Sequence, residues 1–127
     1  MPRPAREHQQ AIASLVRNYE PDGYVALPEP GVMLDEETEL SPDVGFFTDL
    51  DSQPAVVVEV HRWNGRKYIT SKCEQFLNYA NAKEAFVYFY DVGTWMRITK
   101  GRGAKPKVEE EESHSEVLGI DLDDLLD

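Results

Sequence analysis

Two acidic residues stand inside apolar segments of this chain. Asp43 lies in the sequence Ser-Pro-Asp-Val-Gly-Phe-Phe at positions 41–47, and Glu59 lies in Ala-Val-Val-Val-Glu-Val-His at positions 55–61. Moving an ionised carboxylate out of water, among Val and Phe side chains, is costly unless a positive charge compensates it. Two such residues on neighbouring strands suggest a shared cation. The sequence therefore predicts a metal site formed by Asp43 and Glu59.

The segments that must position these acids follow an α/β pattern. Apolar residues at helical spacing predict a first helix over residues 5–19 and a second over 67–81. Strands are expected over 24–27, 32–34, 44–48, 55–61, 85–90 and 94–99. The run at 55–61 is apolar on both faces except for Glu59 and His61, which a period of two places on the same side. Such a strand is typical of the centre of a sheet that helices cover.

Length and composition indicate one domain with a substantial core. The chain has 127 residues, of which 41% are hydrophobic, so we expect a single domain over residues 1–127. Within it we expect an N-terminal arm at residues 1–4 and an acidic tail at 109–127. The single cysteine, Cys73, excludes an intrachain disulfide and a Cys-rich zinc site. No apolar run approaches the ~20 residues of a membrane span, and we expect a soluble, cytoplasmic protein with no membrane partner.

The charge of the chain is strongly negative but unevenly distributed. Its 24 acidic and 13 basic residues give a formal net charge of −11, and a uniform field of that sign would repel nucleic acid. However, residues 18–61 contain 11 acids and no Lys or Arg, whereas residues 62–107 contain ten of the 13 basic residues. Segregation of this kind leaves a basic region where a phosphate backbone could bind.

The order of these features resembles that of the PD-(D/E)XK restriction-endonuclease-like superfamily. The matching features are Pro42-Asp43, the apolar hairpin, Glu59-Val60-His61, a helix that carries Lys72, and an aromatic strand that ends in Asp91. Within the superfamily, the chain is most similar to the Uma2-like family of restriction-endonuclease-like proteins of unknown function. The resemblance runs from the opening helix at residues 8–15 to the closing segment at 117–125. It implies an α/β fold with a restriction-endonuclease-like core, a central mixed sheet flanked by helices.

The resemblance implies metal-dependent hydrolysis of phosphodiester bonds in nucleic acid, with DNA as the expected substrate. Asp43 and Glu59 would hold Mg²⁺ (or Mn²⁺) through carboxylate oxygens, with help from the backbone carbonyl of Val60. The usual lysine of the superfamily stands two residues after the second acid, where this chain has His61. The resemblance therefore points to Lys72 of the following helix as the source of the ammonium group. His61 is a further catalytic candidate, because imidazole titrates near neutral pH.

The turn after Glu59 offers contacts for nucleic acid. Arg62, Arg66 and Lys67 supply positive charge for phosphates, and Trp63 supplies a stacking surface. Lys67 is also the second candidate for the ammonium group, after Lys72. A monomer of this size covers little duplex, so we expect a homodimer.

Structural interpretations of the same residues stand beside these. Asp43 could bind local amides at a turn, and Glu59 could form a buried ion pair with Lys72 or with His61. His8, on the apolar face of the first helix, is expected to be a core residue with a polar contact for its ring. Tyr68, Tyr79, Tyr88 and Tyr90 are assigned to the core or to sheet edges.

Two other functional classes fit parts of the sequence. The alternative to a nuclease is a catalytically inactive nuclease-fold module for binding or assembly, which the altered residues 59–62 and the charge of −11 favour. A small acidic mimic of nucleic acid would use the carboxylates of residues 20–51. That last hypothesis leaves Glu59 in its Val strand unexplained.

Overall fold

The computed structural model describes residues 5–49, 52–103 and 105–127, in which two helices flank a mixed sheet. The principal elements are α1 (Arg6–Asn18), β1 (Val25–Pro28), β4 (Val44–Phe47), β5 (Val56–His61), α2 (Arg66–Tyr79), β6 (Glu84–Phe89), β7 (Thr94–Lys100) and β8 (Pro106–Glu110). The short elements are β2 (Val32–Met33), β3 (Glu39–Leu40), the 3-10 helix η1 (Trp63–Gly65), β9 (His114–Ser115), β10 (Ile120–Asp121) and the 3-10 helix η2 (Leu122–Leu125). The predicted fold class, a mixed sheet flanked by helices, is confirmed.

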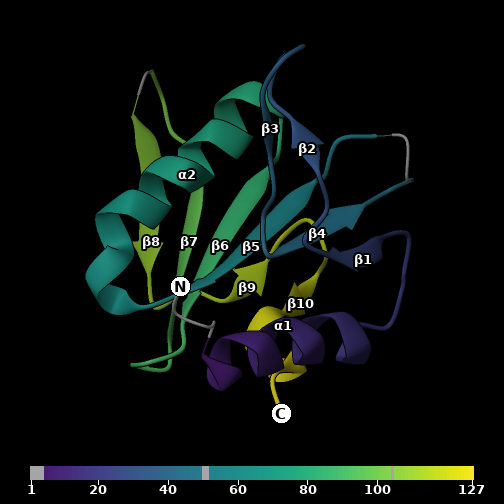
Figure 1. The fold of residues 1–127 in the computed structure, drawn as a ribbon, viewed down its shortest axis with the longest axis vertical. Helices are drawn as coiled ribbons and strands as arrows, with labels where there is room; N and C mark the ends of the chain where they lie inside the picture. Colours follow the sequence, from purple (N-terminus) through teal and green to yellow (C-terminus); the bar gives the residue numbers. More distant parts are fainter. Residues whose placement is uncertain (1–4, 50–51, 104) are drawn as a thin grey trace.

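The main sheet has six strands in the order β1-β4-β5-β6-β7-β8 (Figure 1). The pair β5 and β6 is parallel, because α2 carries the chain back across the sheet between them. All other neighbours in this sheet are antiparallel. The run of Val residues in β5 occupies the centre, as the two-sided apolar pattern predicts.

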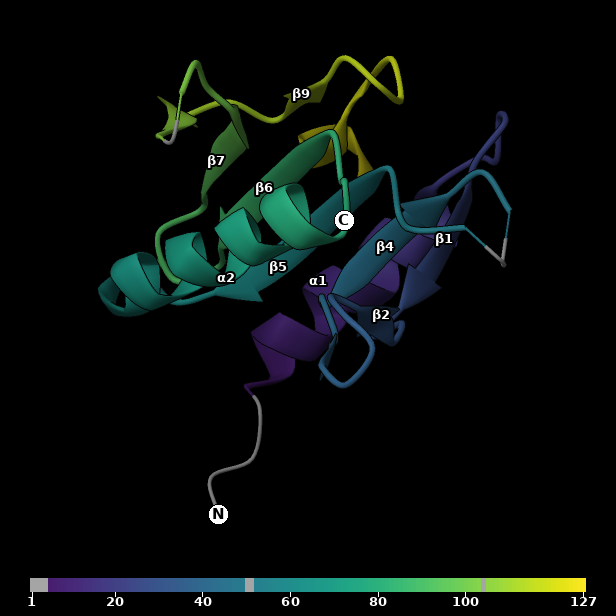
Figure 2. The ribbon, with the colours of Figure 1, turned by 90° about the horizontal axis from the view of Figure 1, so that it is seen from above.

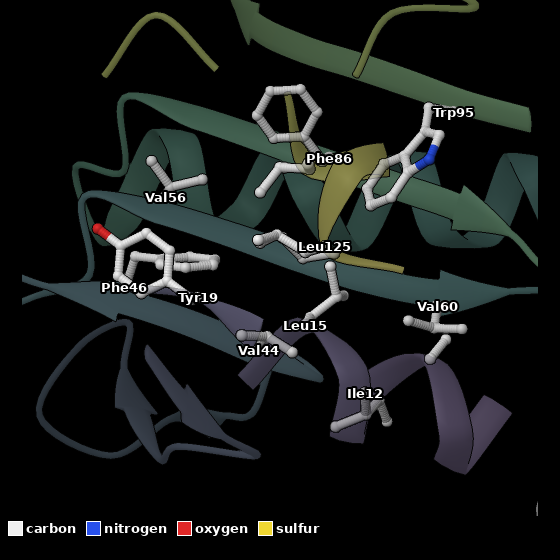
Figure 3. Packing of buried hydrophobic residues seen from close by; sticks show 13 residues of the cluster. Ile12, Leu15, Tyr19, Val44, Phe46, Val56, Val60, Phe86, Trp95 and Leu125 are labelled. Atoms are coloured by element: carbon white, nitrogen blue, oxygen red, sulfur yellow. The ribbon is translucent and has the colours of Figure 1, made fainter. Parts of the chain in front are cut away.

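Alternating side chains of β5 divide the core between the two faces of the sheet. Val56, Val58 and Val60 face α1, and Val57 faces α2. In Figure 3 the residues of the α1 side, among them Leu15 of α1, lie on the near side of the strands. Since successive residues of a strand point to opposite faces, Glu59 belongs to the α2 side together with Val57.

The helix α2 lies alongside β5 and β6 (Figure 2). It buries Ile69, Cys73, Phe76 and Leu77, whose spacing puts them on one face. The helix ends where Asn81 adopts a left-handed conformation with φ 58°. There the N–H of residue 82 donates to the carbonyl of Phe76, which closes the last turn.

The closing segment is packed against the domain. Leu122 and Leu125 are buried in the cluster that contains α1, so the predicted acidic tail at residues 109–127 contributes to the core. Strand β8, which begins at Pro106, precedes this segment at the edge of the main sheet. Among the described residues, no helix combines the length and the apolar character that crossing a membrane requires.

Buried Glu84 fastens this segment to the sheet. Its carboxylate accepts hydrogen bonds from Arg97 at 2.9 Å, from the hydroxyl of Ser115 at 2.6 Å, and from the backbone N–H groups of Glu116 and Val117 at 2.9 and 3.3 Å. Because the charge is paired and fully hydrogen-bonded, its burial is tolerated.

Candidate functional site

The two acids predicted as metal ligands lie opposite each other at one end of the β4–β5 pair. The antiparallel register pairs Val44 with Val58. Asp43 directly precedes Val44, and Glu59 directly follows Val58, so the register places these acids face to face. This is also the carboxyl end of β5, and binding sites of α/β sheets are commonly found beyond the carboxyl ends of strands.

Backbone hydrogen bonds hold both carboxyl groups in place. The N–H of Asp43 donates to Oε1 of Glu59 at 3.0 Å, and the N–H of Val60 donates to Oδ2 of Asp43 at 2.7 Å. Each carboxylate is therefore held by a backbone N–H at or next to the other acid. The structure thus brings together the two carboxylates that the sequence singled out.

A lysine from α2 completes the cluster. Nζ of Lys72 lies 3.1 Å from Oε1 and 2.9 Å from Oε2 of Glu59, and it donates to the backbone carbonyl of Ser41 at 2.9 Å. The stem of Lys72 lies along the helix while its amine reaches the strand ends. This is the location expected for the catalytic ammonium group. The same contact also satisfies the structural interpretation, in which Lys72 and Glu59 form a buried ion pair.

With His8 counted as neutral, the cluster carries more negative than positive charge. Glu59 is only 2% exposed. Its burial, followed by the charge of Asp43, raises the pKa of Glu59 from 4.5 to about 7, although Lys72 acts in the opposite direction. Lys72 therefore offsets one carboxylate, and the raised pKa of His8 favours a second positive charge beside Asp43. A further cation would stabilise the ionised form of the pair.

His8 enters the site from α1, which the sequence did not reveal. Its Nε2 lies 3.4 Å from Oδ2 of Asp43, and its ring makes an edge contact with Tyr90. Hydrogen bonding to Asp43 raises the pKa of His8, and partial burial opposes that effect. The sequence did predict a polar contact for this ring. Its partner could not be read from the helical pattern, because the partner depends on where α1 crosses the strand ends.

His61 stands one step beyond Glu59 on the same face of β5. Its ring stacks on Tyr68 of α2, with centroids 6.1 Å apart and an interplanar angle of 19°. Its Nδ1 is 3.1 Å from the carbonyl oxygen of Arg62. These contacts hold His61 against Tyr68 and the start of the turn, and its catalytic role stays a prediction. Tyr68 is 61% exposed, so the assignment of this ring to the core is wrong.

The predicted nucleic-acid contacts surround the turn between β5 and α2. Nε of Arg62 donates to the hydroxyl of Tyr90 at 2.9 Å, and the N–H of Trp63 donates to Oδ1 of Asp91 at 3.0 Å. These bonds tie the turn to the end of β6. The guanidinium of Arg66 lies 4.1 Å from the ring centre of Trp63. Lys67 is exposed at the start of α2.

The oxygen atoms of the cluster suit a hard divalent cation. Asp43 and Glu59 provide carboxylate oxygens, and Val60 has a backbone carbonyl next to them; Mg²⁺ and Mn²⁺ prefer such ligands. Across the described residues, no group of three or more His, Cys, Asp or Glu side chains is arranged to hold a metal. An ion here would therefore use two carboxylates and take its other ligands from backbone, water and substrate, as Mg²⁺ often does.

Comparison with known proteins identifies the fold. Neither a protein-family model nor a curated protein matches the chain. A crystal structure from Anabaena variabilis ATCC 29413, described as that of a "putative nuclease belonging to DUF820", matches with a TM-score of 0.64 at 12% sequence identity. The match covers 98% of this chain and 82% of that protein. At this identity the likeness establishes the fold alone: the chain shares the α/β fold of that protein.

Proposed function

We propose that this protein is a metal-dependent nuclease that hydrolyses phosphodiester bonds of nucleic acid, with DNA as its substrate. One observation carries the proposal: Asp43 and Glu59 meet at a buried strand end, where each carboxylate accepts a hydrogen bond from the backbone beside the other acid. Two carboxylates held this close repel each other, and a divalent cation bound between them would relieve that repulsion.

The residues of the cluster divide the chemistry between them. Asp43, Glu59 and the carbonyl of Val60 would hold Mg²⁺ or Mn²⁺, which supplies Lewis acidity and lowers the pKa of bound water. The ammonium group of Lys72 lies 2.9 Å from Glu59. In the proposed reaction it would lie beside the substrate phosphate and stabilise the negative charge that develops during displacement at phosphorus. His61 is close enough in the strand to orient water at the edge of the site.

The substrate would approach over the basic turn. Residues 60–73 contain Arg62, Arg66, Lys67 and Lys72 and no acidic residue. This segment offers a local positive field on a chain whose net charge is −11. A homodimer would present two such turns to one nucleic acid and keep the acidic surfaces away from it.

A cleavage assay tests the proposal. Purified protein is incubated with plasmid and with single-stranded DNA in Mg²⁺, in Mn²⁺ and in EDTA, beside Asp43→Asn prepared in parallel. Cleavage by the wild type that requires the metal and falls by at least ~10²-fold in the variant supports the function. Undiminished cleavage by Asp43→Asn would remove Asp43 from the mechanism and count against the proposal. A folded wild type without cleavage in either metal refutes the proposal.

The alternative is an inactive nuclease-fold binding or assembly module. It is favoured by the fact that Lys72 already bonds both carboxylate oxygens of Glu59 and the carbonyl of Ser41. An internal cation of this kind can replace a metal. Calorimetric titration separates the two functions, because an inactive module predicts no binding of Mn²⁺ at millimolar concentration. Binding that Glu59→Gln abolishes supports the nuclease.

A further inference from the structure

The turn that joins β5 to α2 presents an exposed planar surface beside the carboxylates. Tyr68 is 61% exposed, and its ring lies nearly parallel to the imidazole of His61 in an offset stack, with centroids 6.1 Å apart and an interplanar angle of 19°. Exposure alone does not mark a binding site, because single exposed aromatic rings are common on protein surfaces; Tyr68 stands out because its neighbour His61 is on the strand that carries Glu59. Its open surface has the shape of a stacking partner for another flat ring.

The pair His61–Tyr68 lies next to the pair Glu59–Lys72 along both the strand and the helix. On β5, Glu59 and His61 are two residues apart on one face, which corresponds to about 7 Å. On α2, Lys72 and Tyr68 are four residues apart on one face, which corresponds to about 6 Å. The pairs Glu59–Lys72 and His61–Tyr68 therefore form consecutive bridges between strand and helix. Their separation equals about two base steps of a stacked strand, at about 3.4 Å each.

The imidazole ring of His61 is held in one orientation. Its Nδ1 is 3.1 Å from the carbonyl oxygen of Arg62, and it lies directly over Gly65. A side chain at position 65 would put its Cβ 2.1 Å from Cε1 of His61, so glycine makes room for this ring. A preorganised platform loses little conformational entropy when a ligand stacks on it.

The charges around the pair favour a polyanion on the Tyr68 side. Lys67 directly precedes Tyr68 in α2 and is exposed, and residues 60–73 contain no acid. By contrast, the hollow beside Trp63 has a volume of about 280 Å³ and is lined in part by Glu110 and Glu111. Those carboxylates would repel a phosphate backbone, which therefore follows the Tyr68 side of the turn.

We propose that Tyr68, backed by His61, is a stacking platform for an unpaired nucleobase, and that the site acts on single-stranded nucleic acid. The faces of bases inside a duplex are covered by their neighbours, whereas an unpaired base can lie on an aromatic ring. The proposal rests on the proposed function, because it uses the distance between the platform and the two carboxylates. It adds a substrate class to that function.

Binding measurements test the platform separately from catalysis. Fluorescence anisotropy is recorded with a labelled oligothymidylate of about 12 nucleotides and with a duplex of the same length, a size within the range of single-strand sites. Ca²⁺ replaces Mg²⁺, and cleavage in Mg²⁺ or Mn²⁺ is measured in parallel. Tyr68→Ala should weaken single-strand binding by about 5- to 150-fold, the usual loss for one stacked base. Tyr68→Phe, which keeps the ring, should bind as the wild type does.

Tyr79 supplies the matched control. It is 64% exposed on the same helix, at the end far from the site, so Tyr79→Ala should bind as the wild type does. Unchanged single-strand binding by Tyr68→Ala, or tighter binding of the duplex by the wild type, overturns the platform. If cleavage persists in either case, the proposed function survives. Tyr68-dependent binding without any cleavage refutes the nuclease and keeps the platform, and no binding to either DNA overturns both.

Discussion

Replacing Glu59 by Gln tests the electrostatics of the site in a single measurement. The pKa of Glu59 rises from 4.5 to about 7, first through burial and then through Asp43. Between these pH values the unfolded chain has lost this proton while the folded chain retains it, so the free energy of unfolding falls as the pH rises. A shift of about 2.5 pKa units corresponds to about 3 kcal/mol. The variant cannot ionise and should lack this loss.

Both proteins are denatured with urea in EDTA at pH values from about 4 to about 8, and unfolding is monitored by tryptophan fluorescence. The free energy of unfolding of Glu59→Gln, relative to the wild type, should increase by about 3 kcal/mol across this range. At the upper end, Mn²⁺ should stabilise the wild type and leave the variant unchanged. Parallel stability curves for the two proteins would show that Glu59 is ionised without strain, and the charge excess proposed for the site would be refuted.

Two further substitutions distinguish catalytic from structural charges. Lys72→Ala should reduce single-turnover cleavage by about 10²-fold or more, because it removes the ammonium group beside the phosphate. The control variant Lys67→Ala should retain most of the rate. Equal rates in the two variants would remove Lys72 from the mechanism. Glu84→Gln should lower the free energy of unfolding by about 3–5 kcal/mol at about pH 8 in urea denaturation, the opposite sign to Glu59→Gln, because Arg97 would lose its buried partner. A neutral effect of Glu84→Gln would contradict that ion pair.

The helices and the central strands were readable from local periodicity. The helix predicted over residues 5–19 is Arg6–Asn18, and the strand predicted over 55–61 is Val56–His61. Hydrophobic spacing indicates such elements because each buries one face or two faces of its own. Strand β8 was not predicted, because hydrophobic spacing indicates only those strands that bury a face. Its residues are polar and largely exposed, and its hydrogen bonds are supplied by β7, to which it pairs.

The buried charged residues were also only partly predictable from the sequence. Asp43 and Glu59 stood out because they interrupt apolar strands, and the structure brings them together through the register of β4 and β5. Glu84 stands at the start of a strand in the sequence, and nothing local shows that Arg97, 13 residues later, pairs with it. A buried ion pair across two strands becomes visible only when the strands are aligned.

Residue types and spacing alone therefore determined the two helices, the central valine strand and the two acids, whereas the choice of Lys72 came from the resemblance to a known family. The tertiary structure decided which side chains meet: it placed His8 against Asp43, and it laid the exposed ring of Tyr68 on His61. The physical reason is the range of the interactions. Periodicity acts between residues a few positions apart, whereas these contacts depend on how α1 and α2 pack over strands that lie far away in the chain.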